Sequence, residues 1–133
     1  MSSDSDRSSA QRRVLEMLVD AVRLLAADAP EQRRFFPEWI DVCNEMACYL
    51  GDSIDLLRAN GGLTALSAIQ IAQLDALRAR MQKLYSDRSG PSDAPQDPAS
   101  AAWNSIRHQA RELLREHRWD APPSGGFVSF IPG

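Results

Sequence analysis

The sequence predicts an all-α protein in which four helices form one antiparallel bundle. Three observations predict this fold. Apolar residues recur at steps of three and four along four segments, and stretches that contain proline or glycine separate those segments. The chain also has 133 residues, of which 44% are hydrophobic, enough for a single core. Helices that each carry one apolar face bury those faces by packing around one another, which gives a bundle.

The first helix is predicted over residues 10–28. Ser8 or Ser9 can cap its start, and the preceding residues, 1–9, are rich in serine and aspartate and are expected to be disordered. Pro30 disfavours helical geometry at the residue before it, so residues 29–34 are predicted to be a connection. The apolar stripe of this helix is formed by Leu15, Leu18, Val22 and Leu25.

The second helix is predicted over residues 37–59, with Pro37 in its first turn. Asn60, Gly61 and Gly62 tolerate the left-handed conformation that ends many helices, so a tight reversal should follow. Gly51 lies inside this helix and indicates the close approach of a neighbouring helix or a bend. The buried side is expected to carry Trp39, Cys43, Met46, Leu50, Ile54 and Leu57.

The third and fourth helices are predicted over residues 64–86 and 98–119. A polar, proline-rich linker, residues 87–98, separates them, and Asp97 is the expected cap of the fourth helix. The third helix should bury Leu66, Ile69, Leu74, Leu77, Met81 and Leu84. The fourth should bury Ala99, Trp103, Ile106, Ala110, Leu113 and His117.

The predicted domain organisation is therefore a disordered segment, residues 1–9, a bundle, residues 10–119, and an extended tail, residues 120–133. The tail contains the apolar run 127–131, which should not stay exposed to water. It either folds back over the bundle as a strap or docks on a partner protein. The N-terminus lacks the apolar stretch of a secretory signal, so we expect a cytoplasmic protein whose two cysteines are unbridged thiols.

Five acidic residues of the predicted second helix fall on one side of it and form an acidic stripe: Glu38, Asp41, Glu45, Asp52 and Asp55. Convergent carboxylates are the ligands that Mg²⁺ prefers. The spacings Glu38-x-x-Asp41 and Asp52-x-x-Asp55 resemble the paired-carboxylate motifs of the all-α nucleotide pyrophosphohydrolases, and this resemblance implies a Mg²⁺-dependent enzyme. In that family, however, glutamates dominate and the motifs lie on two facing helices. A solvated acidic face is the simpler interpretation.

The predicted fourth helix carries a basic stripe, Arg107, Arg111, Arg115 and Arg118, at steps of four, four and three. Nucleic-acid binding is one interpretation, but the formal net charge of −3 argues against a general phosphate-binding surface. We favour a basic stripe that meets an acidic stripe, such as that of the second helix, either within the bundle or on a partner protein.

These patterns together predict a non-enzymatic protein-interaction module, for example an immunity or antitoxin-like inhibitor or a regulatory subunit. It would bind another protein, or a second copy of itself, and would need no cofactor. Two alternatives stay open: a Mg²⁺-dependent phosphohydrolase that uses the acidic stripe, and a nucleic-acid-binding accessory subunit. No catalytic residue is predicted, and the residues expected to bind a partner are Arg107, Arg111, Arg115, Arg118, Phe127, Phe130 and Ile131.

Overall fold

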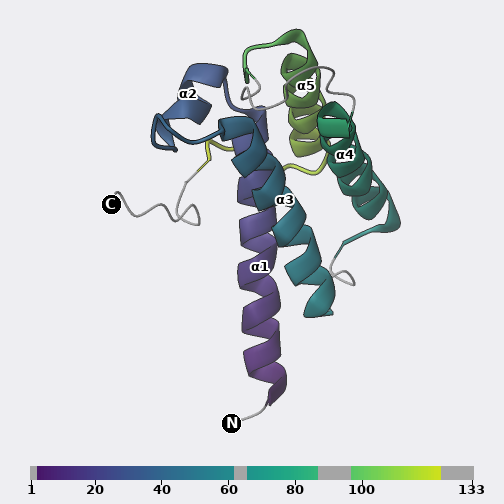
Figure 1. Cartoon of the computed structure of the whole chain (residues 1–133). Helices are drawn as coiled ribbons and strands as arrows, with labels where there is room; N and C mark the ends of the chain where they lie inside the picture. Colours follow the sequence, from purple (N-terminus) through teal and green to yellow (C-terminus); the bar gives the residue numbers. More distant parts are fainter. Residues whose placement is uncertain (1–2, 62–65, 87–96, 124–133) are drawn as a thin grey trace.

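The protein is all-helical throughout the residues that its structure, a computed structural model, describes: 3–61, 66–86 and 97–123. This confirms the predicted fold class. No helix of this described part is long and apolar enough to cross a membrane. The helices are α1 (Ser3–Ala26), α2 (Ala29–Arg34), α3 (Val42–Ala59), α4 (Ala68–Ser86) and α5 (Ala101–Glu116) (Figure 1).

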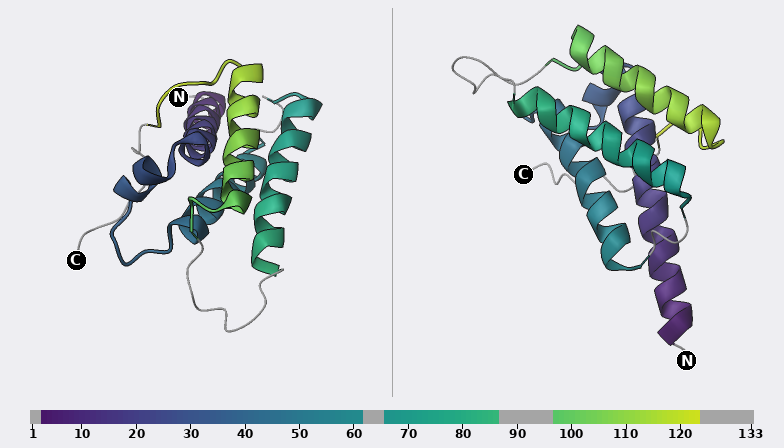
Figure 2. Two further views of the ribbon diagram at one scale, coloured as in Figure 1. Left: turned by 90° about the horizontal axis from the view of Figure 1, so that it is seen from above. Right: turned by 90° about the vertical axis from the view of Figure 1, so that its right-hand side faces the viewer.

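Four of these helices close into a ring. Helix α1 packs against α3 and α5, and α4 packs against the same two helices from the opposite side. Each long helix therefore contacts its neighbours in sequence, and the last one contacts the first, as in an antiparallel bundle with alternating directions. Figure 2 shows α4 and α5 side by side and inclined to α1. The short α2 lies outside the ring, near the C-terminal end of α1.

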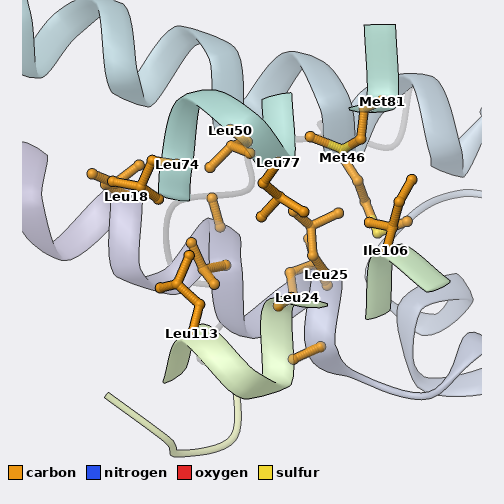
Figure 3. Packing of buried hydrophobic residues seen from close by; sticks show 14 of the residues in the cluster. Leu18, Leu24, Leu25, Met46, Leu50, Leu74, Leu77, Met81, Ile106 and Leu113 are labelled. Carbon is orange, nitrogen blue, oxygen red and sulfur yellow. The ribbon is translucent and has the colours of Figure 1, made fainter. Parts of the chain in front are cut away.

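The core lies where the four long helices face one another (Figure 3). Most of the predicted apolar stripes are buried there, because residues three and four apart share one face of a helix. Each helix contributes large side chains that are almost completely buried: Leu18 and Leu25 from α1, Met46 and Leu50 from α3, Leu74 and Leu77 from α4, and Ile106 and Leu113 from α5.

Three residues predicted to be buried are exposed: Trp39, Ile69 and Ala99. Trp39 is 76% exposed, because it precedes α3 instead of lying within it. Ile69 is 63% exposed, because at 100° per residue it points about 140° away from Leu74 on α4. Ala99 is exposed because it precedes α5, and the predicted burial of all three side chains is wrong.

Helix α1 begins earlier than predicted. It starts at Ser3 instead of residue 10, so residues 3–9, which were expected to be disordered, are helical. Neither glycine nor proline occurs between Ser3 and Ala26, so nothing in this polar stretch breaks the helix before the apolar stripe begins.

Residues 29–34, predicted to be a connection, form α2. Asp28 occupies the N-cap position and Pro30 lies in the first turn. A proline is tolerated there because the first N–H groups of a helix have no intrahelical acceptor. The same proline that ends the predicted first helix therefore starts a new one.

Helix α3 begins at Val42, five residues later than predicted. The side chain of Asp41 caps it by accepting a hydrogen bond from the backbone N–H of Asn44, with an N–O distance of 3.2 Å. Before it, the N–H of Ile40 donates to the carbonyl of Pro37 at 3.1 Å, which makes a turn. The predicted end is confirmed, because α3 stops at Ala59 and Gly61 has a φ of +70°.

The starts of α4 and α5 are also later than predicted. Ser67 and Gln70 exchange hydrogen bonds between side chain and backbone, and this capping pair starts α4 at Ala68. Ser100, not Asp97, caps α5. Most of the predicted linker, residues 87–96, and the tail from residue 124 onward lie outside the described residues, and the division into three segments stays a prediction.

Candidate functional site

The C-terminal end of α1 is closed by side chains from other elements. A helix leaves its last carbonyl groups without intrahelical partners. Here the buried Gln32 of α2 donates from Nε2 to the carbonyl oxygens of Leu24 and Leu25, at 3.0 and 3.1 Å. Two arginines of the predicted basic stripe complete this arrangement.

Arg107 is buried, with 7% of its surface exposed, and its guanidinium group lies among neutral oxygen atoms. It donates to the carbonyl oxygens of Ala27 at 2.7 Å and Pro98 at 2.8 Å, to Gln32 Oε1 at 3.1 Å, and to Asn104 Oδ1. Burial lowers the pKa of Arg107, but arginine stays protonated in proteins. The negative end of the α1 dipole favours a cation at this position.

Arg111 continues the same closure at the surface. Its Nε donates to the carbonyl of Ala26 at 2.8 Å, and its Nη2 forms an ion pair with Asp28 Oδ1 at 2.7 Å. Arg111 therefore meets one acidic residue within the bundle, Asp28, whereas Arg107 meets neutral oxygens only. Neither contact is with the acidic stripe, so the predicted pairing of the two stripes within the bundle is wrong for these two arginines, and both side chains bind the end of α1.

Arg115 and Arg118 are exposed, so half of the basic stripe remains at the surface. Arg118 has a φ of +58°, and its N–H donates to the carbonyl of Arg115 at 3.3 Å. The N–H of Trp119 donates to the carbonyl of Leu114 at 2.8 Å. This pair of hydrogen bonds is the Schellman motif, which reverses the chain after a helix.

The acidic stripe is divided among separate roles. Glu38 precedes α3, Asp41 caps it, and only Glu45, Asp52 and Asp55 lie on the helix. Asp55 forms two hydrogen bonds with Arg78 of α4, at 2.8 and 3.1 Å, and these lower the pKa of its carboxyl group. Within the described residues, no group of three or more His, Cys, Asp or Glu side chains is placed to hold a metal ion.

Gly51 allows the arginine that pairs with Asp55 to lie against α3. A Cβ atom at Gly51 would lie 3.4 Å from the guanidinium nitrogens of Arg78. The neighbour of Gly51 is thus the end of an α4 side chain, and the expected close approach of a helix or bend at this glycine stays a prediction.

The two cysteines differ in burial, and His117 packs at the end of a helix. Cys43 is buried, whereas Cys48 is exposed. Burial is the main cause that raises the pKa of the Cys43 thiol, to about 12. The Nε2 of His117 lies 2.6 Å from Gln73 Oε1, and its ring lies 5.3 Å, between centroids, from that of Trp119. His117 thus links the ends of α4 and α5, as expected for a packing residue at a helix terminus.

A groove of about 570 Å³, here called the corner groove, lies between α2, the turn before α3 and the segment before α5. Two of its lining residues, Arg33 and Asp97, form an ion pair with an N–O distance of 2.7 Å. Trp39 is not one of the lining residues, but in the sequence it lies between two of them, Glu38 and Ile40, and its side chain is 76% exposed. The lining consists of Arg33, Arg34, Pro37, Glu38, Ile40, Val42, Asp97 and Pro98.

Sequence reasoning missed this groove because it placed Trp39 inside a helix. The available signal was Asp41, an N-cap residue type three positions before Asn44 and directly before an apolar run. Helix α3 would then begin after Asp41, which leaves Trp39 outside it.

The fold and this site define the protein as an all-α bundle with a groove at one corner. In comparisons with known proteins, the chain matches no family model, no curated protein and no solved structure at a significant level.

Proposed function

We propose that the protein is a non-enzymatic protein-interaction module and that the corner groove, together with Trp39, binds the partner. The observation that carries this proposal is the 76% exposure of Trp39, which directly follows and precedes lining residues of the groove in the sequence. Tryptophan is among the residue types most enriched at the positions that dominate binding energy.

Burial of Trp39 by a partner would contribute enough free energy to affect binding strongly. A tryptophan buries on the order of 200 Å² when it is fully covered, and removal of apolar surface from water is worth roughly 25 cal/mol per Å². Burial of the exposed part of Trp39 by a partner would therefore contribute about 3–4 kcal/mol. That contribution corresponds to a factor of more than about 100 in affinity.

Local structure explains why Trp39 stays outside. Pro37 starts the turn that Ile40 closes, and Ile40 and Val42 are half-buried in the groove wall. Within this turn Glu38 and Trp39 are exposed, whereas the flanking Pro37 and Ile40 are half-buried. A preformed loop of this kind binds with little loss of conformational entropy.

The charge of the whole chain also bears on the choice of partner. The formal net charge of −3 favours a partner with a basic surface, such as a target that an inhibitor or regulatory subunit would mask. Arg115 and Arg118 remain exposed and can contribute contacts, whereas Arg107 and Arg111 are committed to the end of α1. A second copy of the chain is also a candidate partner.

Affinity capture from the source cells tests this proposal. Wild-type protein and two variants, Trp39→Ala and Ile69→Ala, serve as bait. Ile69 is 63% exposed on α4 and is the matched control. We expect wild type and Ile69→Ala to retain the same specific protein. Trp39→Ala should bind that protein with an affinity lower by at least roughly 30-fold, which is the effect of losing a 2 kcal/mol hot spot. Equal recovery by all three, or no specific protein with wild type, would refute it.

A further inference from the structure

The chain leaves α5 in a fixed direction. The Schellman motif at Arg118 reverses the backbone, and Nε of Arg23 on α1 donates to the carbonyl oxygen of Trp119 at 2.7 Å. The segment after α5 is thereby anchored across the C-terminal part of α1.

Residues 121–123 then reach the start of α2. Pro122 and Pro123 share a shallow groove of about 260 Å³ with Asp28 and Glu31. The end of the described chain therefore lies beside α2, and the opposite end of that short helix carries Arg33 and Arg34 of the corner groove.

The distance from Pro123 to the corner groove is short. Helix α2 has six residues and is about 9 Å long at 1.5 Å per residue. The apolar run, residues 127–131, follows Pro123 by four to eight residues, which span up to roughly 13–26 Å when extended. The run can therefore reach the corner groove from Pro123.

The chemistry of the two surfaces also matches. No charged residue occurs between Ser124 and Gly133, and four of the five residues in the run 127–131 are large and apolar. The walls of the corner groove include Pro37, Ile40 and Val42, and its arginine at position 33 is already neutralised by an aspartate. A groove with this lining favours an uncharged apolar occupant over an acidic peptide.

We propose that residues 127–131 occupy the corner groove of the same chain, with Phe127, Phe130 and Ile131 packed against Ile40 and Val42. This inference rests on the proposed function, because it adds regulation to the same surface. A partner that binds the corner groove must displace the tail or bind the tail and groove together.

Paramagnetic relaxation in the full-length chain tests the inference. The variant Cys48→Ser/Ser129→Cys carries one nitroxide label, because Cys43 is fully buried and does not react. We expect the methyl resonances of Ile40 and Val42 to lose most of their intensity and those of Ile69 to keep theirs. Addition of Phe127→Ser, Phe130→Ser and Ile131→Ser to the labelled chain should restore the lost intensity.

Three outcomes would overturn the proposal: no loss at Ile40 and Val42, equal loss at Ile69, or no recovery in the serine variant. A mixture of labelled chains with isotopically enriched, unlabelled chains distinguishes a second copy. Broadening in that mixture would assign the groove to another molecule and also refute occupancy by the same chain. Because this experiment involves no partner, its failure is separate from a failed capture with Trp39→Ala.

Discussion

Replacement of the buried arginine by methionine, Arg107→Met, should destabilise the protein strongly. The substitution removes the charge and all donors but keeps an unbranched apolar stem of similar length. Its matched control is Arg115→Met, since Arg115 lies two turns further along α5 and is exposed. Exposed substitutions of this kind usually change stability by less than about 0.5 kcal/mol.

The size of this destabilisation follows from the hydrogen bonds that Arg107 makes. Arg107 donates to four oxygens, and two of these, the carbonyls of Ala27 and Pro98, belong to the main chain and cannot be removed with it. A buried acceptor left without a donor costs about 1–3 kcal/mol. The substitution also removes the free-energy cost of burying a charge, and this gain opposes the loss. The two carbonyls dominate, so we expect a net loss of about 2–4 kcal/mol in the free energy of unfolding.

Urea unfolding, followed by the helical circular dichroism signal, measures this difference. Arg107→Lys should fall between wild type and Arg107→Met, because a lysine keeps the charge but cannot reach all the acceptors at once. A free energy of unfolding for Arg107→Met equal to or above that of Arg115→Met would refute the reasoning. It would mean that the cost of burying the charge outweighs its hydrogen bonds.

Four further predictions concern single side chains. Arg118→Gly should raise the free energy of unfolding by about 1 kcal/mol, because glycine adopts the φ of +58° without a Cβ clash; an unchanged urea midpoint would contradict this. Ser53→Ala should stabilise α3 by about 1 kcal/mol, since the buried Ser53 hydroxyl has no hydrogen-bond partner in the described structure; a destabilised variant would reveal one. Thiol titration of the native protein should modify Cys48 rapidly and Cys43 only on unfolding, and two rapid thiols would disprove this assignment. Burial raises the pKa of Cys43 to about 12, so the folded state holds the thiol proton more tightly than the unfolded state does. The free energy of unfolding of wild type should therefore fall as the pH rises from 9 to 12, and it should fall less in Cys43→Ala.

Periodicity predicted the parts of the fold that depend on one helix at a time. The stripe residues Leu18, Met46, Leu77 and Ile106 are all buried, since a helix with one apolar face has only one face to bury. The end of α3 at Ala59 follows from the same local reason, because Asn60 and Gly61 favour a helix end without help from distant residues.

Helix boundaries and the candidate site were harder to predict. Pro30 is compatible both with the end of one helix and with the first turn of the next, and the choice depends on how α2 packs. Trp39 fits the spacing of the apolar stripe but lies outside the helix, because the cap at Asp41 starts α3 after it. Spacing identifies a face, whereas a cap decides where that face begins.

The sequence by itself determined the helical class and most residues of the core, because these follow from the period of apolar residues and from glycine and proline. Only the tertiary structure decided what the charged residues do. Arg107 and Arg115 have the same spacing and chemistry on α5, yet one is buried and the other is exposed. The end of α1 meets α5 at Arg107 and not at Arg115, and a residue's partners across the bundle are set by packing between segments roughly 80 positions apart.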